Sequence, residues 1–411
     1  MRITYLNPTG VVGGAEMCLL DLLASLRATF PTWILRVILG DDGPLLRAVA
    51  DLGVPCDVMP LPGRVSALGD AGLGLSSGGG RAGFSLAARG TGAAVAASSY
   101  LSKLRRRLRA EAPALVQTNG MKAHVLGAWA APRGVPVVWH LHDYPGSRPV
   151  MARLLRWSRR RRVRGVAVSR SVAADAARVL GPRVPIETVY TAVDLARFAP
   201  GPGHGEWLDR LAGFPPAPGG TVRLGLVATY ARWKGHEVFL EAISRLPTDL
   251  PVRFYVIGGP IYRSPGSQYT SGELRTRARE LGLGERVGLI EHQPDAAPVF
   301  RALDVVVHAS TRPEPFGRVI VEAMACGRAV VASRGGGAAE LFEDGVSALG
   351  CPPRDPEALA AVLNRLAGDP RLRQRLGEGG RAAACARFDR ARLAGEWAGV
   401  YAKAGLDVSG G

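Results

Sequence analysis

Short runs of β-branched and other apolar residues alternate with longer Ala-, Leu- and Arg-rich stretches along the whole chain. This alternation predicts parallel strands separated by helices, because a parallel pair needs a long crossover connection and a helix usually supplies it. The chain therefore predicts an α/β fold of two doubly wound units, in which ligands bind beyond the carboxyl ends of the strands. The expected strands cover residues 2–6, 34–39, 114–117, 135–140 and 165–168 in the first half, and 222–227, 253–257, 287–290, 305–308 and 329–333 in the second.

The length of the chain also favours two domains, because 411 residues exceed what one hydrophobic core usually serves. Residues 199–220 are rich in Pro and Gly and predict the connecting segment, although residues 207–211 within it favour a short helix. We therefore expect a first domain over residues 1–198 and a second over residues 199–393. Residues 69–99 contain nine glycines and predict a mobile loop, which is either a lid over a cleft or a tolerated insertion.

Composition places the chain among folded proteins, since 47% of its residues are hydrophobic and 21% are charged. Its five cysteines are scattered and form no Cys-x-x-Cys pair, which argues against a disulfide framework or a zinc site and favours a reducing cytoplasm. The N-terminus reads as a first strand and not as a signal peptide. No apolar run approaches the roughly 20 residues that span a bilayer. The sequence thus predicts a cytoplasmic protein, soluble or peripheral on the inner membrane face.

The net charge of +17 is concentrated in residues 101–164, where arginines cluster at 103–109 and again at 153–164. One interpretation is an ordinary solvated surface. The other is a basic face for an anionic membrane, and Leu154, Leu155 and Trp157 between arginines make the second cluster a candidate interfacial helix. No nucleic-acid motif accompanies this charge, so we expect no nucleic-acid partner.

Two carboxylates eight positions apart carry the clearest chemical signal in the second half. Glu314 lies in a loop with Pro and Gly, and Glu322 lies inside the helix that this loop opens. The unpaired amides at such a helix start, near Phe316 and Gly317, suit a phosphate or sugar hydroxyls. The two oxygens of Glu322 suit a pair of sugar hydroxyls. Together these groups predict a donor site for a nucleotide sugar.

At this point the sequence resembles the family-four retaining glycosyltransferases of GT-B fold. The resemblance rests on the Glu-x7-Glu block of residues 314–322 and on Gly335-Gly-Gly-Ala-Ala-Glu340. Two further matches are Gly13-Gly-Ala-Glu16 and Trp233-Lys-Gly235. The resemblance implies two Rossmann-like domains that face each other across a cleft. It also implies that the C-terminal helix, residues 394–411, rejoins the first domain; a helix that simply caps the second domain is the alternative.

The resemblance implies specific roles in the second domain. Glu314 would hold hydroxyls of the donor sugar, and Glu322 would bind the ribose diol. The backbone amides near Phe316 and Gly317 would hold sugar hydroxyls or phosphate.

Lys234 would neutralise the leaving diphosphate, as the resemblance implies. The family's basic residue five positions before this lysine is absent here, where Thr229 stands. Arg232 is therefore the candidate for the second positive charge. Nothing resembles an Asp-x-Asp metal site, so we expect neither a metal nor another cofactor.

In the first domain, the resemblance implies that the loop of Gly13 and Gly14 lies under the donor phosphate. Glycines there allow a close approach of the backbone to a ligand. Glu16 is either an acceptor-side residue or a partner of the helix dipole.

His142 follows a predicted strand and matches the family's histidine that touches the transferred sugar. His140 alternates with it and is expected to point elsewhere. Asn119 and Lys122 close another strand and are expected on the acceptor side. Catalysis is thus assigned to His142, Lys234 and Glu314.

The implied activity is metal-independent, retaining transfer of a hexose from a uridine or guanosine diphosphate sugar to an acceptor hydroxyl. The basic first domain favours a lipid-linked or cell-envelope glycan as acceptor, and a small molecule is the alternative. A different class is a catalytically inactive GT-B-like protein that binds an anionic membrane or polymer, and Thr229 favours it. A third is an enzyme of this fold that isomerises a nucleotide sugar.

Overall fold

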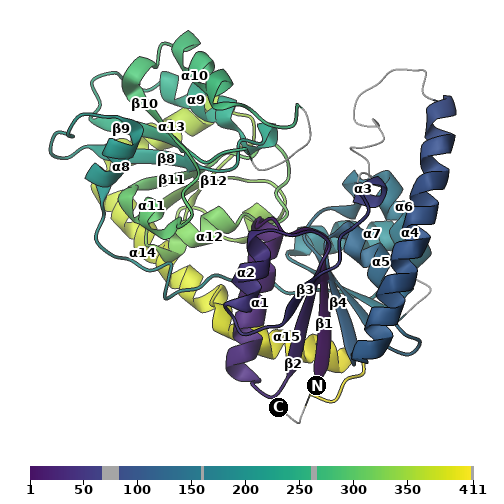
Figure 1. Cartoon of the computed structure of the whole chain (residues 1–411). Coiled ribbons are helices and arrows are strands. Elements are labelled where there is room, and N and C mark those ends of the chain that lie inside the picture. Colours follow the sequence, from purple (N-terminus) through teal and green to yellow (C-terminus); the bar gives the residue numbers. More distant parts are fainter. Residues whose placement is uncertain (67–82, 159–161, 261–265, 409–411) are drawn as a thin grey trace. The chain divides into compact units, whose positions relative to one another are not determined.

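The computed structural model describes residues 1–66, 83–158, 162–260 and 266–408 (Figure 1). Its contacts divide the chain into two compact units. The first unit combines Met1–Ala192 with Arg390–Gly411, and the second unit is Val193–Asp389. The chain therefore leaves the first unit, builds the second without interruption, and then returns.

The first unit is built on a seven-stranded parallel sheet in the order β3-β2-β1-β4-β5-β6-β7. The strand order reverses between β1 and β4, where Leu6 pairs with Thr118. Such a reversal leaves an opening beyond the carboxyl ends of the two central strands. The strands are β1 (Arg2–Asn7), β2 (Ile34–Leu39), β3 (Cys56–Val58), β4 (Leu115–Asn119), β5 (Val137–Leu141), β6 (Val163–Ala167) and β7 (Ile186–Thr188).

Helices cover both faces of this sheet, as a fully buried parallel sheet requires. The longest described helix, α4, contacts α5, which in turn contacts α6. The helices of the unit are α1 (Gly14–Thr29), α2 (Pro44–Ala50), α3 (Gly63–Ser66), α4 (Gly83–Glu111), α5 (Met121–Ala130), α6 (Pro149–Ser158), α7 (Arg170–Leu180) and α15 (Leu393–Lys403).

Helix α4 corrects the loop predicted over residues 69–99. The helix begins at Gly83, so the loop prediction is wrong for residues 83–99, while residues 69–82 lie outside the described part of the chain. The prediction weighted glycine too heavily, because this stretch also contains many alanines, the best helix formers.

The C-terminal helix α15 completes the core of the first unit (Figure 1, yellow). Trp397 and Tyr401 are buried to 1% and 0% exposure, and Trp33 from the far end of the sequence packs in the same core. The Tyr401 hydroxyl donates to Oε1 of Gln117 at 2.7 Å and lies 3.1 Å from the Tyr5 hydroxyl. Sequence-distant segments are thus joined by apolar contacts and by buried hydrogen bonds.

The second unit has a six-stranded parallel sheet in the order β10-β9-β8-β11-β12-β13, with its reversal between β8 and β11. Its strands are β8 (Val222–Val227), β9 (Val252–Ile257), β10 (Val287–Ile290), β11 (Val305–His308), β12 (Ala329–Ser333) and β13 (Leu349–Cys351). Its α-helices are α8 (Gly205–Ala212), α9 (His236–Ser244), α10 (Ser271–Glu280), α11 (Ala297–Ala302), α12 (Arg318–Ala325), α13 (Pro356–Gly368) and α14 (Pro370–Arg387).

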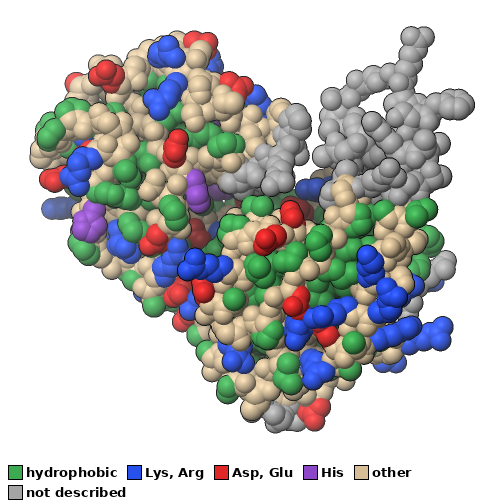
Figure 2. All heavy atoms as spheres, viewed as in Figure 1, with side chains coloured by type: hydrophobic (Ala, Val, Ile, Leu, Met, Phe, Trp, Pro, Cys, Tyr) green, Lys and Arg blue, Asp and Glu red, His purple; other side chains and the backbone are tan. Residues whose placement is uncertain are grey.

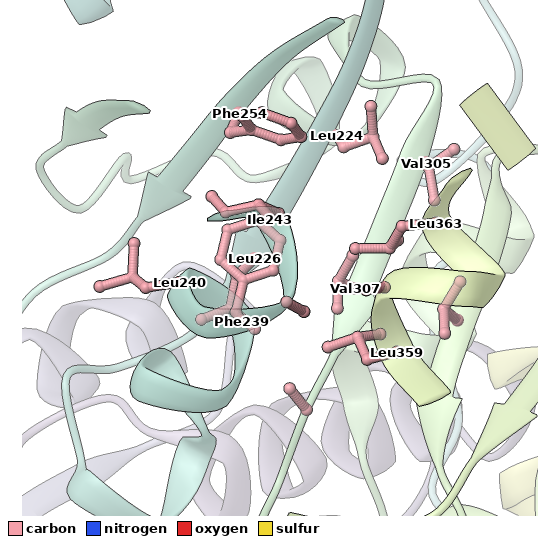
Figure 3. Close-up of a cluster of buried hydrophobic side chains, with 14 of the residues drawn as sticks. Leu224, Leu226, Phe239, Leu240, Ile243, Phe254, Val305, Val307, Leu359 and Leu363 are labelled. Atoms are coloured by element: carbon pink, nitrogen blue, oxygen red, sulfur yellow. The ribbon is translucent and has the colours of Figure 1, made fainter. Parts of the chain in front are cut away.

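One hydrophobic core cluster of the second unit lies on one face of this sheet (Figure 3). Leu226 of β8 and Val307 of β11 meet Phe239 of α9 and Leu363 of α13, and all four side chains are fully buried. This packing fixes the central strands and thereby the loops that leave their carboxyl ends.

The α/β class predicted from the sequence is confirmed, and each predicted strand coincides with an observed one to within two residues at either end. The short helix expected within residues 207–211 is α8. Three strands escaped prediction because each has only three residues, namely β3, β7 and β13.

The predicted interfacial helix is only partly consistent with α6. Leu155 is fully buried and Leu154 is half-buried, so the apolar side of α6 packs into its own unit and Leu155 is not available to a membrane. Trp157 is 57% exposed, and its ring lies 5.2 Å from that of Trp129 in α5. Among the described residues, no helix has both the length and the apolar character needed to cross a bilayer.

Candidate functional site

The second unit places Lys234 against Glu314 where the sheet order reverses. Lys234 ends a short 3-10 turn (Arg232–Lys234) after β8, and Glu314 lies in the loop after β11. The Lys234 Nζ lies 2.9 Å from both carboxylate oxygens. The turn is held against the β11 loop, because the Thr311 amide donates to the Trp233 carbonyl at 2.8 Å.

Two further polar side chains contact the Glu314 carboxylate, and a third holds one of them. The Ser310 hydroxyl donates to Oε2 at 2.7 Å, and His308 Nε2 lies 3.3 Å from the same oxygen. The other ring nitrogen of His308 lies 3.3 Å from the hydroxyl of Ser333, which ends β12. Residues at the ends of β11 and β12 therefore fix the orientation of the carboxylate.

This environment keeps Glu314 ionised. Burial alone would raise the pKa of the carboxyl, but the charge of Lys234 and the hydrogen bond and charge of His308 lower it far below the usual range. The side chains of Glu314 and Lys234 are only 9% and 19% exposed, so water screens the pair weakly. The result is a fixed, buried cation–anion pair at the carboxyl edge of the sheet.

Backbone pairing holds the Glu314 loop in place. The Glu314 amide donates to the Gly335 carbonyl at 3.3 Å, and the Gly337 amide donates to the Glu314 carbonyl at 2.7 Å. Gly317 then caps helix α12 with φ of 103°, a conformation that side chains strongly disfavour. The Phe316 side chain packs in the unit against Phe388, with ring centroids 6.0 Å apart.

Glu322 lies on α12, where the structure pairs it with Arg318 one turn earlier. Both Nε and Nη2 of Arg318 lie 3.2 Å from Glu322 Oε1, and the two side chains are 11% and 12% exposed. Glu322 is thus an oriented, nearly buried carboxylate near the middle of the helix.

The structure places Arg232 apart from the contacts of the Lys234–Glu314 pair. Its guanidinium donates to Glu273 at 2.8 Å and to the Gly266 carbonyl at 3.0 Å, and it stacks over the Tyr269 ring at 4.3 Å. Thr229, which stands where the resemblance implies a basic residue, is partly buried beyond the end of β8. The role assigned to Arg232 remains a prediction.

In the first unit, His142, Asn119 and Asn7 form a chain of hydrogen bonds beyond β5, β4 and β1. His142 Nε2 bonds Oδ1 of Asn119, and Nδ2 of Asn119 donates to Oδ1 of Asn7 at 2.8 Å. The prediction that His140 points elsewhere is wrong, because its ring centroid lies 4.0 Å from that of His142. His140 in turn lies edge-on to Trp397 at 4.7 Å.

Glu16 joins this chain from helix α1. Its Oε2 accepts from the Gly13 amide at 3.1 Å, which closes the N-terminus of the helix, and its Oε1 lies 3.4 Å from Asn7 Nδ2. Burial is the main reason that the pKa of Glu16 is raised, and the nearby Asp143 charge adds to it. The structure thus brings Gly13, Glu16, Asn119 and His142 into one cluster, as well as Asn7.

Two other predicted residues lie at the margins of this cluster. Lys122 is the second residue of α5, and burial, together with the Arg148 charge, lowers its pKa. Gly14 is the first residue of α1, and a Cβ at that position would meet no atom within 4 Å. The space over Gly14 is therefore open within its unit.

Within the described ranges, no group of three or more His, Cys, Asp or Glu side chains is arranged to hold a metal ion. The charged side chains described at this site form two ion pairs, Lys234 with Glu314 and Arg318 with Glu322.

Family models cover most of the chain in two pieces. Residues 12–197 match the model described as Glycosyltransferase Family 4, and residues 214–383 match the model described as Glycosyl transferases group 1. The chain belongs to the family-four glycosyltransferases. The predicted family is thereby confirmed on both of its halves.

Curated relatives of this glycosyltransferase include D-inositol 3-phosphate glycosyltransferases. That of Thermobifida fusca is 36% identical over 199 residues, 47% of this chain and 44% of the relative. That of Xylanimonas cellulosilytica is 34% identical over 249 residues, 58% of this chain and 56% of the relative. The chain spans about half the length of the curated relatives it matches.

Solved structures resemble this glycosyltransferase over nearly its full length. Anabaena Alr3699/HepE, solved in complex with UDP-glucose, aligns with a TM-score of 0.78 at 25% identity, over 98% of this chain and 100% of HepE. Sucrose-phosphate synthase from Thermosynechococcus elongatus aligns with a TM-score of 0.74 at 18% identity, over 98% and 99% of the two chains, and supports the fold alone. The predicted GT-B fold is confirmed.

Sequence reasoning missed several residues of these clusters in the glycosyltransferase. His308 and Ser333 end predicted strands, and Ser310 lies two residues beyond β11, so their strand-end positions were the available signal. Asn7 likewise ends the first strand. Arg318 carries no spacing signal apart from its place four residues before Glu322.

Proposed function

We propose that this glycosyltransferase transfers a hexose from a nucleotide diphosphate sugar to an acceptor hydroxyl, with retention of the anomeric configuration and without a metal ion. The observation that carries the proposal is the buried Lys234–Glu314 pair at the reversal point of the second sheet. This is the place where open α/β sheets bind ligands.

The pair offers a positive charge for the diphosphate and a carboxylate for the hydroxyls of a nucleotide sugar. The Lys234 ammonium has three donors, two of which meet the Glu314 carboxylate, and its charge can stabilise a diphosphate as it leaves. The Glu314 carboxylate, held in place by Ser310, can accept hydrogen bonds from sugar hydroxyls. Because these groups are fixed before the substrate arrives, little reorganisation accompanies the reaction.

Helix α12 supplies the remaining donor contacts in this proposal. Its N-terminal amides, beginning at the Gly317 cap, can hold phosphate or sugar hydroxyls, and Glu322 can accept from the ribose diol. We place no residue as a covalent nucleophile. Retention then requires attack from the side of the leaving group, where the departing phosphate takes the proton of the incoming hydroxyl.

We propose a uridine diphosphate hexose as the donor, because HepE, the 25% identical solved neighbour, was captured with UDP-glucose. The test is a screen of uridine, guanosine and adenosine diphosphate sugars by thermal shift and by donor hydrolysis. Stabilisation and turnover with uridine donors, retained in the presence of a chelator, are the expected results. Turnover only with guanosine donors would overturn the choice of carrier, and loss of activity in the chelator would overturn metal independence.

The same screen tests the alternative of a binding protein without catalysis. Thr229 in place of a basic residue is the observation that favours that alternative. Binding of nucleotide with no turnover of any donor or acceptor would support it.

For the acceptor, we propose a lipid-linked or cell-envelope glycan at an anionic membrane surface. Exposed basic side chains lie on α4 and α6, two helices that both pack on α5. Trp129 of α5 joins them, since its carbonyl accepts from Arg105 Nε at 3.0 Å and its ring contacts Trp157. Figure 2 shows Lys and Arg gathered on the lower right of the view, over the first unit. We call this the basic surface, and its exposed members are Lys103, Arg106, Arg109, Arg153 and Arg156.

Sedimentation with vesicles tests the basic surface. Binding to vesicles that contain anionic lipid, weakening as salt rises, is expected, because each Lys or Arg near such a surface contributes about 1 kcal/mol. Arg153→Glu with Arg156→Glu should abolish binding and leave donor hydrolysis unchanged. Equal sedimentation with neutral vesicles, or none in low salt, would reject the membrane and favour a small-molecule acceptor.

A further inference from the structure

Two asparagines occupy equivalent places at the centre of the first sheet. Asn7 is the last residue of β1 and Asn119 is the last residue of β4, the two strands between which the sheet order reverses. Both side chains are 2% exposed, and they are hydrogen-bonded to each other at 2.8 Å. Buried amides at a reversal point are placed to act on a ligand-binding edge, directly or through a neighbour.

The orientation of each amide is fixed by a backbone carbonyl, which can only accept. Nδ2 of Asn7 donates to the Thr9 carbonyl at 2.7 Å, and Nδ2 of Asn119 donates to the Ala15 carbonyl at 3.2 Å. Turning either amide over would set two oxygens against each other. The bond from Asn119 Nδ2 to Asn7 Oδ1 agrees with both assignments.

These orientations leave Oδ1 of Asn119 facing Nε2 of His142. An amide oxygen carries no proton, so the proton of this hydrogen bond belongs to Nε2. A neutral imidazole has one protonated nitrogen, and Nδ1 is therefore the basic nitrogen of His142. The other end of the chain is anchored by Glu16, which lies 3.4 Å from Asn7 Nδ2 and binds the Gly13 amide.

We propose that Asn7 and Asn119 are positioning residues that hold His142 in a single orientation, as the tautomer protonated on Nε2. His142 then acts on a substrate hydroxyl as an acceptor through Nδ1, and not as a donor. The effect on sugar transfer rests on the proposed function. The tautomer does not, because it follows from contacts within the first unit.

The tautomer is read directly by long-range ¹H–¹⁵N correlation spectra of the whole protein at pH 8, with His142→Ala to assign the signals. In the natural chain, Nε2 should appear protonated and Nδ1 unprotonated. The Asn119→Ala and Asn7→Ala variants should show a mixture of both tautomers. Asn364→Ala, an exposed position on α13 and the third asparagine of the chain, is the matched control and should leave the spectrum unchanged.

A spectrum of the natural chain with Nδ1 protonated would overturn the inference even if both variants failed to fold. An unchanged His142 signal in Asn119→Ala would overturn it as well. Inactivity of the natural chain toward every donor would reject the proposed function, while the spectra would still decide the tautomer.

Transfer kinetics separate positioning from a merely structural role. Asn119→Ala should lower kcat about tenfold or more, as losing an outer partner of a functional histidine typically does. Asn119→Asp keeps an acceptor for Nε2–H but adds a negative charge, which favours the charged imidazolium and raises the pKa of His142. The acidic limb of the pH profile of kcat should therefore move to higher pH by about one unit. A lower rate with an unshifted profile and an unchanged tautomer would indicate a structural role only.

Discussion

The Lys234–Glu314 ion pair affects both the stability of the second unit and the proposed catalysis. The charge of Lys234 keeps Glu314 ionised in a site that water barely reaches. Removing one partner leaves the other as an uncompensated buried charge, whereas removing both avoids that cost. Stability and catalysis can therefore be separated at this pair by comparing single and double variants.

We expect Lys234→Ala and Glu314→Ala each to lower kcat/KM for transfer by on the order of a hundredfold, the usual cost of one preorganised electrostatic contact. Each should also lower the melting temperature. The double variant should regain part of the melting temperature but none of the activity. Initial rates with a labelled donor and thermal unfolding measure the two effects, with Arg375→Ala, at an exposed position of α14, as control. Recovered transfer in the double variant would show that the pair serves stability alone.

At the residue scale, the sequence predicted chemistry where a motif constrained it. Glu314 and Lys234 stand in blocks with Pro, Gly and an apolar helix, so their spacing carried information. His308 and Ser310 escaped because a His and a Ser near a strand end are common in any α/β protein. The Asn7–Asn119 contact joins residues 112 positions apart, and only the strand order brings them together.

Among the structural elements, the turn after β8 depends on a glycine. Gly235 has φ of 80°, and a Cβ there would lie 1.9 Å from the carbonyl oxygen of Ala309 beyond β11. The two loops that carry Lys234 and Glu314 therefore approach each other more closely than any side chain at this position allows.

Gly235→Ala should therefore destabilise the second unit by more than the roughly 1–3 kcal/mol that a strained backbone conformation alone costs. Gly282→Ala is the matched control, since Gly282 has φ of 67° but open space around it. Denaturant unfolding of both variants measures the difference. Equal losses of unfolding free energy in the two variants would mean that the loop of Ala309 moves away from a Cβ at position 235 without cost.

A second prediction concerns helix α8, which is tied to the sheet through Asp209. Its carboxylate lies 2.7 Å from Arg223 and 2.9 Å from Arg253, and it accepts from the Tyr255 hydroxyl. Burial alone would raise the pKa of Asp209, but these hydrogen bonds and charges lower it.

Asp209→Asn should cost on the order of 3 kcal/mol at pH 7, because it leaves two nearly buried guanidinium groups without their counter-charge. A lowered pKa in the folded state adds stability above the unfolded pKa of about 3.9, and this stability is lost as pH falls through the folded value. The gap in melting temperature between the natural chain and the variant should thus be wide at pH 7 and should begin to close only as pH falls below about 4. Asp249→Asn, at an exposed position, should show neither effect.

Elements with many buried β-branched residues were predictable, since a strand buried on both faces reads as a continuous apolar run. β3, β7 and β13 were not, because three residues carry too little pattern. Helix α4 shows the opposite error, where glycine count concealed a favourable alanine content. The burial of Leu155 in α6 was not predictable either, since an amphipathic pattern does not say whether its apolar side meets lipid or protein.

For the molecule as a whole, the stability of the first unit depends on the C-terminal segment that returns to it. Trp397 and Tyr401 of α15 are core residues of a unit whose core outside this helix comes mainly from the first 192 residues. The last helix is thus part of the first unit's core and not an appendage.

Trp397→Ala should lower the free energy of unfolding of the first unit by about 3–5 kcal/mol, the usual cost of deleting a buried aromatic side chain. Hydrogen exchange should become faster in β1 and α1 and stay unchanged in β8 and β11. Trp157→Ala, where the side chain is 57% exposed, is the control. Faster exchange in β8 and β11 as well would show that the two units unfold together.

This discontinuous first unit also bears on synthesis at the ribosome. Residues 193–389 contain every strand of the second sheet, so the second unit needs no segment that is synthesised after residue 389. The first sheet is made earlier, but its core is complete only once Trp397 and Tyr401 have been made. The half of the chain that emerges first is therefore the half that matures last.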